Sequence, residues 1–125
     1  MYERVGLLGL AQSVAQHASD RQNIIAQNVA NADTPGYKAR DLTPFKIDAT
    51  NAFEMRRTSD LHLSSPADQN MAWRTFEVVA QSDPNGNSVN LEDEVLRAVD
   101  AGRAHNRAVT IYQTSLQILR SSIGR

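Results

Sequence analysis

The sequence predicts a mainly α-helical protein whose long N- and C-terminal helices pair as a coiled-coil-like hairpin. Two observations lead to this fold class. Small and apolar residues recur at alternating spacings of three and four near both ends of the chain, and this period is lost in between. We therefore expect one domain with three parts, residues 1–33, 34–88 and 89–125. The middle part is expected to be short and loosely ordered, with room for one or two small β-hairpins.

The first helix is predicted over residues 2–32, about 45 Å at 1.5 Å per residue. Its repeat averages 3.5 residues, as in a coiled-coil seam. The seam positions are Leu8, Ala11, Ala15, Ala18, Ile25, Val29 and Ala32, with Gln22 as an interruption. Alanines allow another backbone to approach closely but bury little area, so this helix is expected to need a partner helix.

A turn is predicted directly after this helix. Thr34 precedes a proline and is disfavoured in the helical region, while Pro35 has no N–H to continue the helix. Pro35 and Gly36 suit the two central positions of a type II turn, since the second requires a positive φ. Asn28 and Asn31 lie one turn apart near the helix end, where we expect their amides to satisfy free carbonyls.

The middle segment carries only short patterns. Alternating apolar residues predict brief strands at 45–47 and 53–55, and residues 75–80 are the best strand candidate. Residues 82–87 combine Ser, Asp, Pro, Asn and Gly, which indicates a turn. Trp73 is expected to pack on this protein or on a neighbouring subunit.

The second helix has a well-marked start. Asn90 suits the N-cap, and Glu92, Asp93 and Glu94 lie where the helix dipole favours negative charge. Asp93 and Arg97 have the spacing of an i,i+4 ion pair, and Asp100 and Arg103 have that of an i,i+3 pair. The predicted seam positions are Leu91, Val95, Ala98, Gly102, His105, Val109, Tyr112, Leu116, Leu119 and Ile123. Two such seams in one short chain are expected to pair with each other.

Composition argues against several classes of function. The 13 basic and 14 acidic residues give no basic surface for nucleic acid, and the absence of cysteine excludes disulfides and thiolate sites. His17 and His62 lack metal-binding spacings, His105 is interpreted as a polar seam residue, and no catalytic or phosphate-binding motif is present. We therefore expect no enzyme, cofactor, metal or small-molecule substrate. The apolar run at residues 5–11 is too short to span a bilayer and matches a secretory signal peptide only weakly, so it is interpreted as the first turns of a helix.

The string from Asn28 to Asp41 resembles the N-terminal signature of bacterial flagellar basal-body rod proteins, most closely their short proximal-rod members. The matching motif positions are Asn28, Asn31, Asp33, Thr34, Pro35, Gly36, Tyr37, Lys38 and Arg40. The stretch from Val89 to Glu94 onward agrees with the same family. The resemblance implies terminal helices that pack together and against neighbouring subunits in a tube around the export channel. It also implies that the segment after the turn motif contacts adjacent subunits.

The implied function is a structural subunit of the proximal rod, which transmits torque and lies in the periplasm after type III export without a cleaved signal peptide. The implied partners are copies of itself, other rod proteins, the membrane-ring-to-rod adaptor, the rod-capping muramidase and the type III export apparatus. The expected assembly seam comprises Leu8, Ala11, Ala15, Ile25, Val29, Leu91, Val95, Val109, Tyr112, Leu116, Leu119 and Ile123. Two alternatives remain, the other short proximal-rod protein of the family and a soluble helical adaptor that forms no filament.

Overall fold

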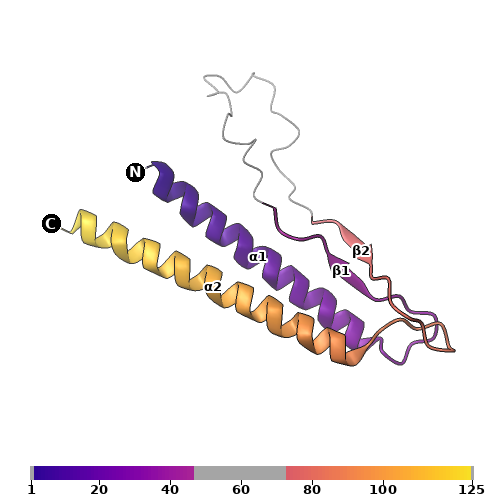
Figure 1. Cartoon of the computed structure of the whole chain (residues 1–125). Coiled ribbons are helices and arrows are strands. Elements are labelled where there is room, and N and C mark those ends of the chain that lie inside the picture. Colours follow the sequence, from indigo (N-terminus) through magenta and orange to yellow (C-terminus); the bar gives the residue numbers. More distant parts are fainter. Residues whose placement is uncertain (1, 47–72, 125) are drawn as a thin grey trace, which may run out of the picture.

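Two long helices form an antiparallel hairpin in the computed structural model, which describes residues 2–46 and 73–124. Helix α1 spans Tyr2–Ala30 and helix α2 spans Leu91–Ile123, with the short strands β1 (Arg40–Leu42) and β2 (Thr75–Glu77) between them in sequence. The helices lie side by side and both chain ends are at the same end of the hairpin (Figure 1). Helix α1 lies between α2 and the two-stranded sheet. The predicted mainly α-helical hairpin is confirmed.

The helix ends follow the local sequence. Helix α1 ends at Ala30, two residues before the predicted end. Helix α2 begins directly after Asn90, whose extended backbone and Oδ1 make it the N-cap. The N–H groups of Glu92 and Asp93 donate to this oxygen over 2.9 and 3.4 Å. The predicted N-cap is therefore confirmed, and it satisfies donors that have no partner within the helix.

Small side chains form the contact between the helices. The buried residues recur every seven positions, at Ala11, Ala18 and Ile25 on α1 and at Ala101, Ala108 and Ser115 on α2. Gly102 also faces α1, since a Cβ at this position would lie 3.7 Å from Nε2 of Gln22. Side chains of this size let the two backbones approach closely, which explains a narrow interface with a seven-residue period.

The predicted seam of α2 agrees with the structure only in part. Gly102 faces α1, and Val109 and Tyr112 line a pocket with Ala11 and Ala15 of α1, but none of these three is among the buried residues of α2. The buried positions Glu94, Ala101, Ala108 and Ser115 each precede a predicted seam position by one residue. One residue corresponds to about 100° around a helix, so the larger aliphatic side chains point to the flank or to solvent. Leu91, Val95, Tyr112 and Ile123 are exposed, and Val109, Leu116 and Leu119 are half-buried. Close backbone packing selects alanine and serine for the interface, which the apolar pattern alone did not reveal.

On α1 the predicted seam agrees better with the structure. Ala11 and Ile25 are buried between the helices, and Leu8 and Ala15 are half-buried. Val29 is 44% exposed and does not belong to the interface. The preceding residue, Asn28, is buried instead, and its side chain faces β1.

The sheet pairs β1 with β2 in antiparallel register, with Asp41 opposite Phe76. The prediction of a strand within residues 75–80 is confirmed. The prediction for residues 45–47 is wrong for its described part, because the strand lies at Arg40–Leu42 and residues 45 and 46 are not in a strand. Phe45 instead packs on His17 and Trp73. The stretch 53–55 lies outside the described residues.

Trp73 packs on this chain, as one of the two predicted possibilities. Its ring lies edge-on to His17 at a centroid distance of 4.7 Å and tilted against Phe45 at 5.3 Å. Nε2 of the buried His17 donates to the carbonyl oxygen of Thr43 over 2.8 Å, because a carbonyl can only accept. This cluster fixes the chain after β1 against the middle of α1.

Candidate functional site

The end of α1 and the two turns beside it form the motif region of the chain. The N–H of Tyr37 donates to the carbonyl oxygen of Thr34 over 3.2 Å, and Gly36 has a φ of 74°. These features confirm the predicted turn, in which Gly36 supplies the positive φ. A second turn approaches it closely, since a Cβ on Gly86 would lie 3.4 Å from the Cα of Gly36. The N–H of Gly36 also donates to the carbonyl oxygen of Asn85 over 3.0 Å.

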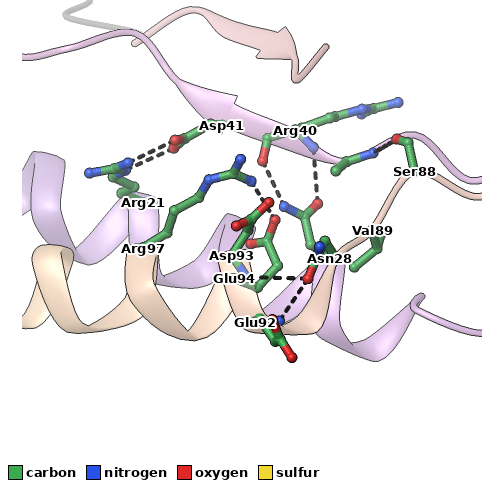
Figure 2. A network of polar contacts seen from close by, with 12 residues as sticks. Arg21, Asn28, Arg40, Asp41, Ser88, Val89, Glu92, Asp93, Glu94 and Arg97 are labelled. Carbon is green, nitrogen blue, oxygen red and sulfur yellow. Dashed lines mark hydrogen bonds and ion pairs between the residues drawn. The ribbon is translucent and has the colours of Figure 1, made fainter. Parts of the chain in front are cut away.

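Asn28 joins α1 to the start of β1. Its side chain is fully buried, and its Nδ2 donates to the carbonyl oxygen of Arg40 over 2.7 Å. The N–H of Arg40 and the hydroxyl of Tyr37 both donate to Oδ1 of Asn28, over 3.1 and 3.3 Å. The amide therefore pairs with both backbone groups of Arg40 (Figure 2). Our expectation that Asn28 satisfies helix carbonyls is wrong, because its side chain faces β1.

Asn87 instead bonds to the carbonyls that follow the end of α1. Nδ2 of Asn31 donates to the carbonyl oxygen of Gln27 over 2.8 Å, but this oxygen also accepts from the N–H of Asn31 over 3.1 Å, so it is not the free carbonyl that we expected. Nδ2 of the buried Asn87 lies 2.7–2.9 Å from the carbonyl oxygens of Asn31, Ala32 and Thr34. The sequence predicts only that Asn87 lies in a turn, and this role was not predicted. Its position just before α2 offers only a weak signal, because the partners lie more than fifty residues away.

The rest of the motif is mostly open to solvent. Asp33, Thr34, Pro35, Gly36, Lys38 and Arg40 are exposed, and Tyr37 is half-buried. Nζ of Lys38 donates to Oγ of Ser82 over 2.9 Å and to the carbonyl oxygen of Gly86 over 3.0 Å, which ties the two turns together. The side chain of Arg40 extends away from the helices (Figure 2). The motif thus combines a buried asparagine with an exposed edge.

An ion pair connects α1 to β1 farther along the hairpin. Nε and the NH2 group of Arg21 donate to the two carboxylate oxygens of Asp41, each over 2.8 Å. Burial opposes ionisation of Asp41, but the hydrogen bonds from Arg21 and from the N–H of Leu42 outweigh it and lower the pKa of this carboxyl group. The same hydrogen bond raises the pKa of Arg21.

A second ion pair lies within α2. Glu94 is fully buried, and its Oε1 accepts from Arg97 over 2.6 Å. The predicted partner of Arg97 was Asp93, which is exposed. Glu94 replaces it because this carboxylate lies on the side of α2 that faces α1, where a buried charge requires a partner. The sequence predicts for Glu94 only an interaction with the helix dipole, and this ion pair was not predicted.

Two kinds of feature are absent from the described residues, a cluster of metal ligands and a membrane-spanning helix. Within residues 2–46 and 73–124, no three His, Asp or Glu side chains lie close enough to hold a metal ion together. Neither of the two described helices contains an apolar stretch long enough to cross a bilayer. The features that remain are the turn motif and the exposed apolar side chains along α2.

Comparison with known proteins agrees with this description. The family model described as "Flagella basal body rod protein" matches residues 8–38. The flagellar basal body rod protein FlgB of Agrobacterium fabrum is 30% identical, over 97% of this chain and 95% of the relative. FlgB of Escherichia coli is 30% identical over 93% of this chain and 86% of the relative. FlgB of Salmonella typhimurium is 28% identical over 88% of this chain and 87% of the relative.

The helical hairpin, the turn motif at the end of α1 and these similarities together define a flagellar structural protein. The chain belongs to the FlgB family of flagellar basal body rod proteins. The resemblance noted in the sequence is thereby confirmed. The match of the family model from Leu8 to Lys38 covers the same helix end and turn that the structure shows to be tightly bonded.

Proposed function

We propose that the protein is a structural subunit of the proximal rod, which transmits torque from the membrane ring to the distal rod and surrounds the export channel. Membership of the FlgB family, whose members are rod proteins by name, carries this proposal. The structure supports it with large aliphatic side chains on the outside of a narrow helix pair. Such side chains are what a subunit needs for contacts with its neighbours in a helical assembly.

The assembly surface is proposed to consist of the seam residues that the hairpin leaves uncovered. The clearest are Leu91, Val95 and Ile123, which are 52%, 60% and 73% exposed, together with Val29 and Tyr112. A hairpin built on alanines buries little apolar area, so contacts with other subunits are expected to supply much of the stability of the assembled state. The exposed edge of the turn motif from Asp33 to Arg40 is proposed as a further contact with an adjacent subunit.

The proposed partners are copies of this chain, other rod proteins, the adaptor between membrane ring and rod, and the rod-capping muramidase. Delivery is proposed to use the type III export apparatus without cleavage of a signal peptide, to a final position in the periplasmic rod. In these contacts the protein acts by packing and carries out no reaction. The chain would therefore be an element of the drive shaft in which stiffness comes from the contacts between subunits.

Mass spectrometry of purified hook–basal bodies tests this function. The chain is expected to be present in intact basal bodies and to remain with the membrane-ring end after the hook and distal rod have been stripped away. Its absence from intact basal bodies would contradict the proposal and favour a helical adaptor that forms no filament. Loss of the chain together with the distal rod would contradict the proximal position alone.

Matched substitutions at the end of α2 test the proposed surface. Ile123→Asp introduces a charge into the apolar seam, whereas Ser122→Asp introduces the same charge at the neighbouring exposed position. Both carboxylates lie in the last turn of the helix, so their effect on helix stability is similar. We expect only Ile123→Asp to prevent incorporation into basal bodies. Equal incorporation of the two variants would remove Ile123 from the assembly surface.

A further inference from the structure

Charge is distributed unevenly along α2. The part from Leu91 to Asp100 holds four acids and one arginine, whereas the part from Ala101 to Ile123 holds three arginines and no acid. Of the four acids only Glu94 is buried and bonded to Arg97. The exposed charge of this helix is therefore negative at its start and positive farther along, beyond what the helix dipole alone requires.

The opposite charges lie along one outer stripe of the helix. Glu92, Leu96, Val99, Arg103 and Arg107 follow one another at spacings of four, three, four and four residues, which keeps them on one side of an α-helix. All five are exposed, with Leu96 at 65% and Val99 at 45%. The buried alanines of α2 lie on the other side, against α1. The stripe thus presents an acid, two apolar side chains and two arginines to the outside.

A groove of about 790 Å³ accompanies the basic part of this stripe. Its lining includes Arg21, Asp100, Arg103, Arg107 and Ile111. Arg21 is already held by Asp41. Within the part of the chain that the structure describes, Arg103 and Arg107 form no ion pair, so the predicted pair of Arg103 with Asp100 is wrong although both residues line the groove. These two guanidinium groups, beside the half-exposed Ile111, are therefore the groups in the groove that a negatively charged partner can reach.

We propose that this groove receives the acidic first turn of α2 from a second copy of the chain that runs in the same direction. The two copies would be displaced along the helix axis by 11 to 15 residues, or about 16–22 Å, which places Glu92 beside Arg103 or Arg107. Without displacement, like charges would face each other. In the incoming copy, Leu96 and Val99 then lie beside the part of α2 from Arg107 to Thr114 of the first copy.

The choice of this contact rests on the proposed function. A displaced contact between copies that run in the same direction leaves one groove and one acidic turn free at the ends of every oligomer, so further copies can add. Such a heterologous contact continues from subunit to subunit, as a rod requires. An antiparallel pair would also match the charges, but it would close into a dimer and leave neither surface free. The displaced parallel contact is therefore the arrangement that both matches the charges of the stripe and allows a rod to grow.

Two double variants of the full-length chain test the contact. Glu92→Arg with Asp93→Arg reverses the charge of the first turn, and Arg103→Glu with Arg107→Glu reverses the groove. Each variant alone brings like charges together. Its association constant, measured by sedimentation at low salt, is therefore expected to fall about tenfold or more below that of the unaltered chain, because several charge pairs are affected. An equimolar mixture is expected to restore association, because each variant then supplies the charge that the other needs.

A third double variant, Gln113→Glu with Arg120→Glu, changes charge on a different side of α2 and is expected to associate normally. Far-ultraviolet circular dichroism confirms that each variant keeps its helix content, and rescue in the mixture excludes misfolding as the cause. Species whose size grows with concentration support the contact. A closed dimer, a folded mixture that stays monomeric, or an unaltered chain that remains monomeric at low salt overturns it. Each of these results leaves the rod assignment intact, because basal-body composition tests that separately.

Discussion

Replacement of Asn28 by alanine should destabilise the protein more than any other loss of a single polar side chain in the motif. This side chain is fully buried and takes part in three hydrogen bonds, two of them with the backbone of Arg40 at 2.7 and 3.1 Å. A net value of about 1 kcal/mol for each of these two, and a smaller one for the longer bond from Tyr37, gives a loss of roughly 2–3 kcal/mol. The backbone groups of Arg40 would then lack partners from α1.

A matched variant separates these bonds from helix propensity. Asn23 also lies in α1 but is exposed, so Asn23→Ala gains the same preference of alanine for the helix, up to roughly 0.7 kcal/mol, without loss of a buried contact. The assay is urea unfolding of the full chain followed by far-ultraviolet circular dichroism, with the free energy of unfolding compared between the two variants. We expect Asn28→Ala to be the less stable by roughly 2–3 kcal/mol.

A difference of less than about 0.5 kcal/mol would refute the reasoning, since it would mean that the amide of Asn28 contributes no more than solvent does. A change in the slope of the unfolding curve would point to a different conclusion, namely that the segment from Tyr37 to Leu42 detaches before the helices separate. Asn28→Asp provides a second check, because it keeps the size and the acceptor but removes the donor to the carbonyl oxygen of Arg40.

Three further perturbations have defined outcomes. Asp41→Asn should cost roughly 2 kcal/mol at neutral pH through the lost ion pair with Arg21. Because the pKa of Asp41 is lowered on folding, its contribution is complete above the ordinary value of 3.8 and is lost as the pH falls through the lower folded value. Unfolding curves of the variant should therefore depend less on pH in that acidic window, and identical pH profiles would contradict the shift. Gly36→Ala should destabilise the protein by about 1 kcal/mol, because the φ of 74° is unfavourable for alanine. Gly9→Ala should stabilise it, because a Cβ there meets no other atom and alanine favours the helix. Thermal melts measure both variants, and melting temperatures that shift in the same direction would contradict this prediction. Asn90→Ala should cost about 1 kcal/mol in chemical unfolding, and an Asn90→Asp variant that is equally damaged would disprove the capping role.

Much of the local structure could be predicted because its causes are local. Thr34, Pro35 and Gly36 end α1 and form the turn, and Asn90 starts α2, each through backbone preferences that act within a few residues. The hairpin itself followed from two segments with the same seven-residue period. The family could also be recognised, because the motif from Asn28 to Arg40 is a continuous string.

The partners of individual side chains could not be predicted in the same way. Asn28 pairs with Arg40, Asn87 with the end of α1, and Arg21 with Asp41, and each of these contacts joins segments that only the fold brings together. A buried amide or carboxylate takes whichever partner the packed neighbour presents. Arg97 illustrates this, since it pairs with the buried Glu94 and not with the exposed Asp93.

The sequence by itself therefore determined that this chain forms two long helices, where they end to within about two residues on α1, and to which protein family it belongs. The tertiary structure decided which side of each helix faces inward. The apolar period fixes the spacing of a seam, but a shift of one residue turns a helix by about 100° without changing that spacing. The close approach of the backbones placed Ala101 and Ala108 inside and left Val95 and Leu96 on the surface, where another subunit can reach them.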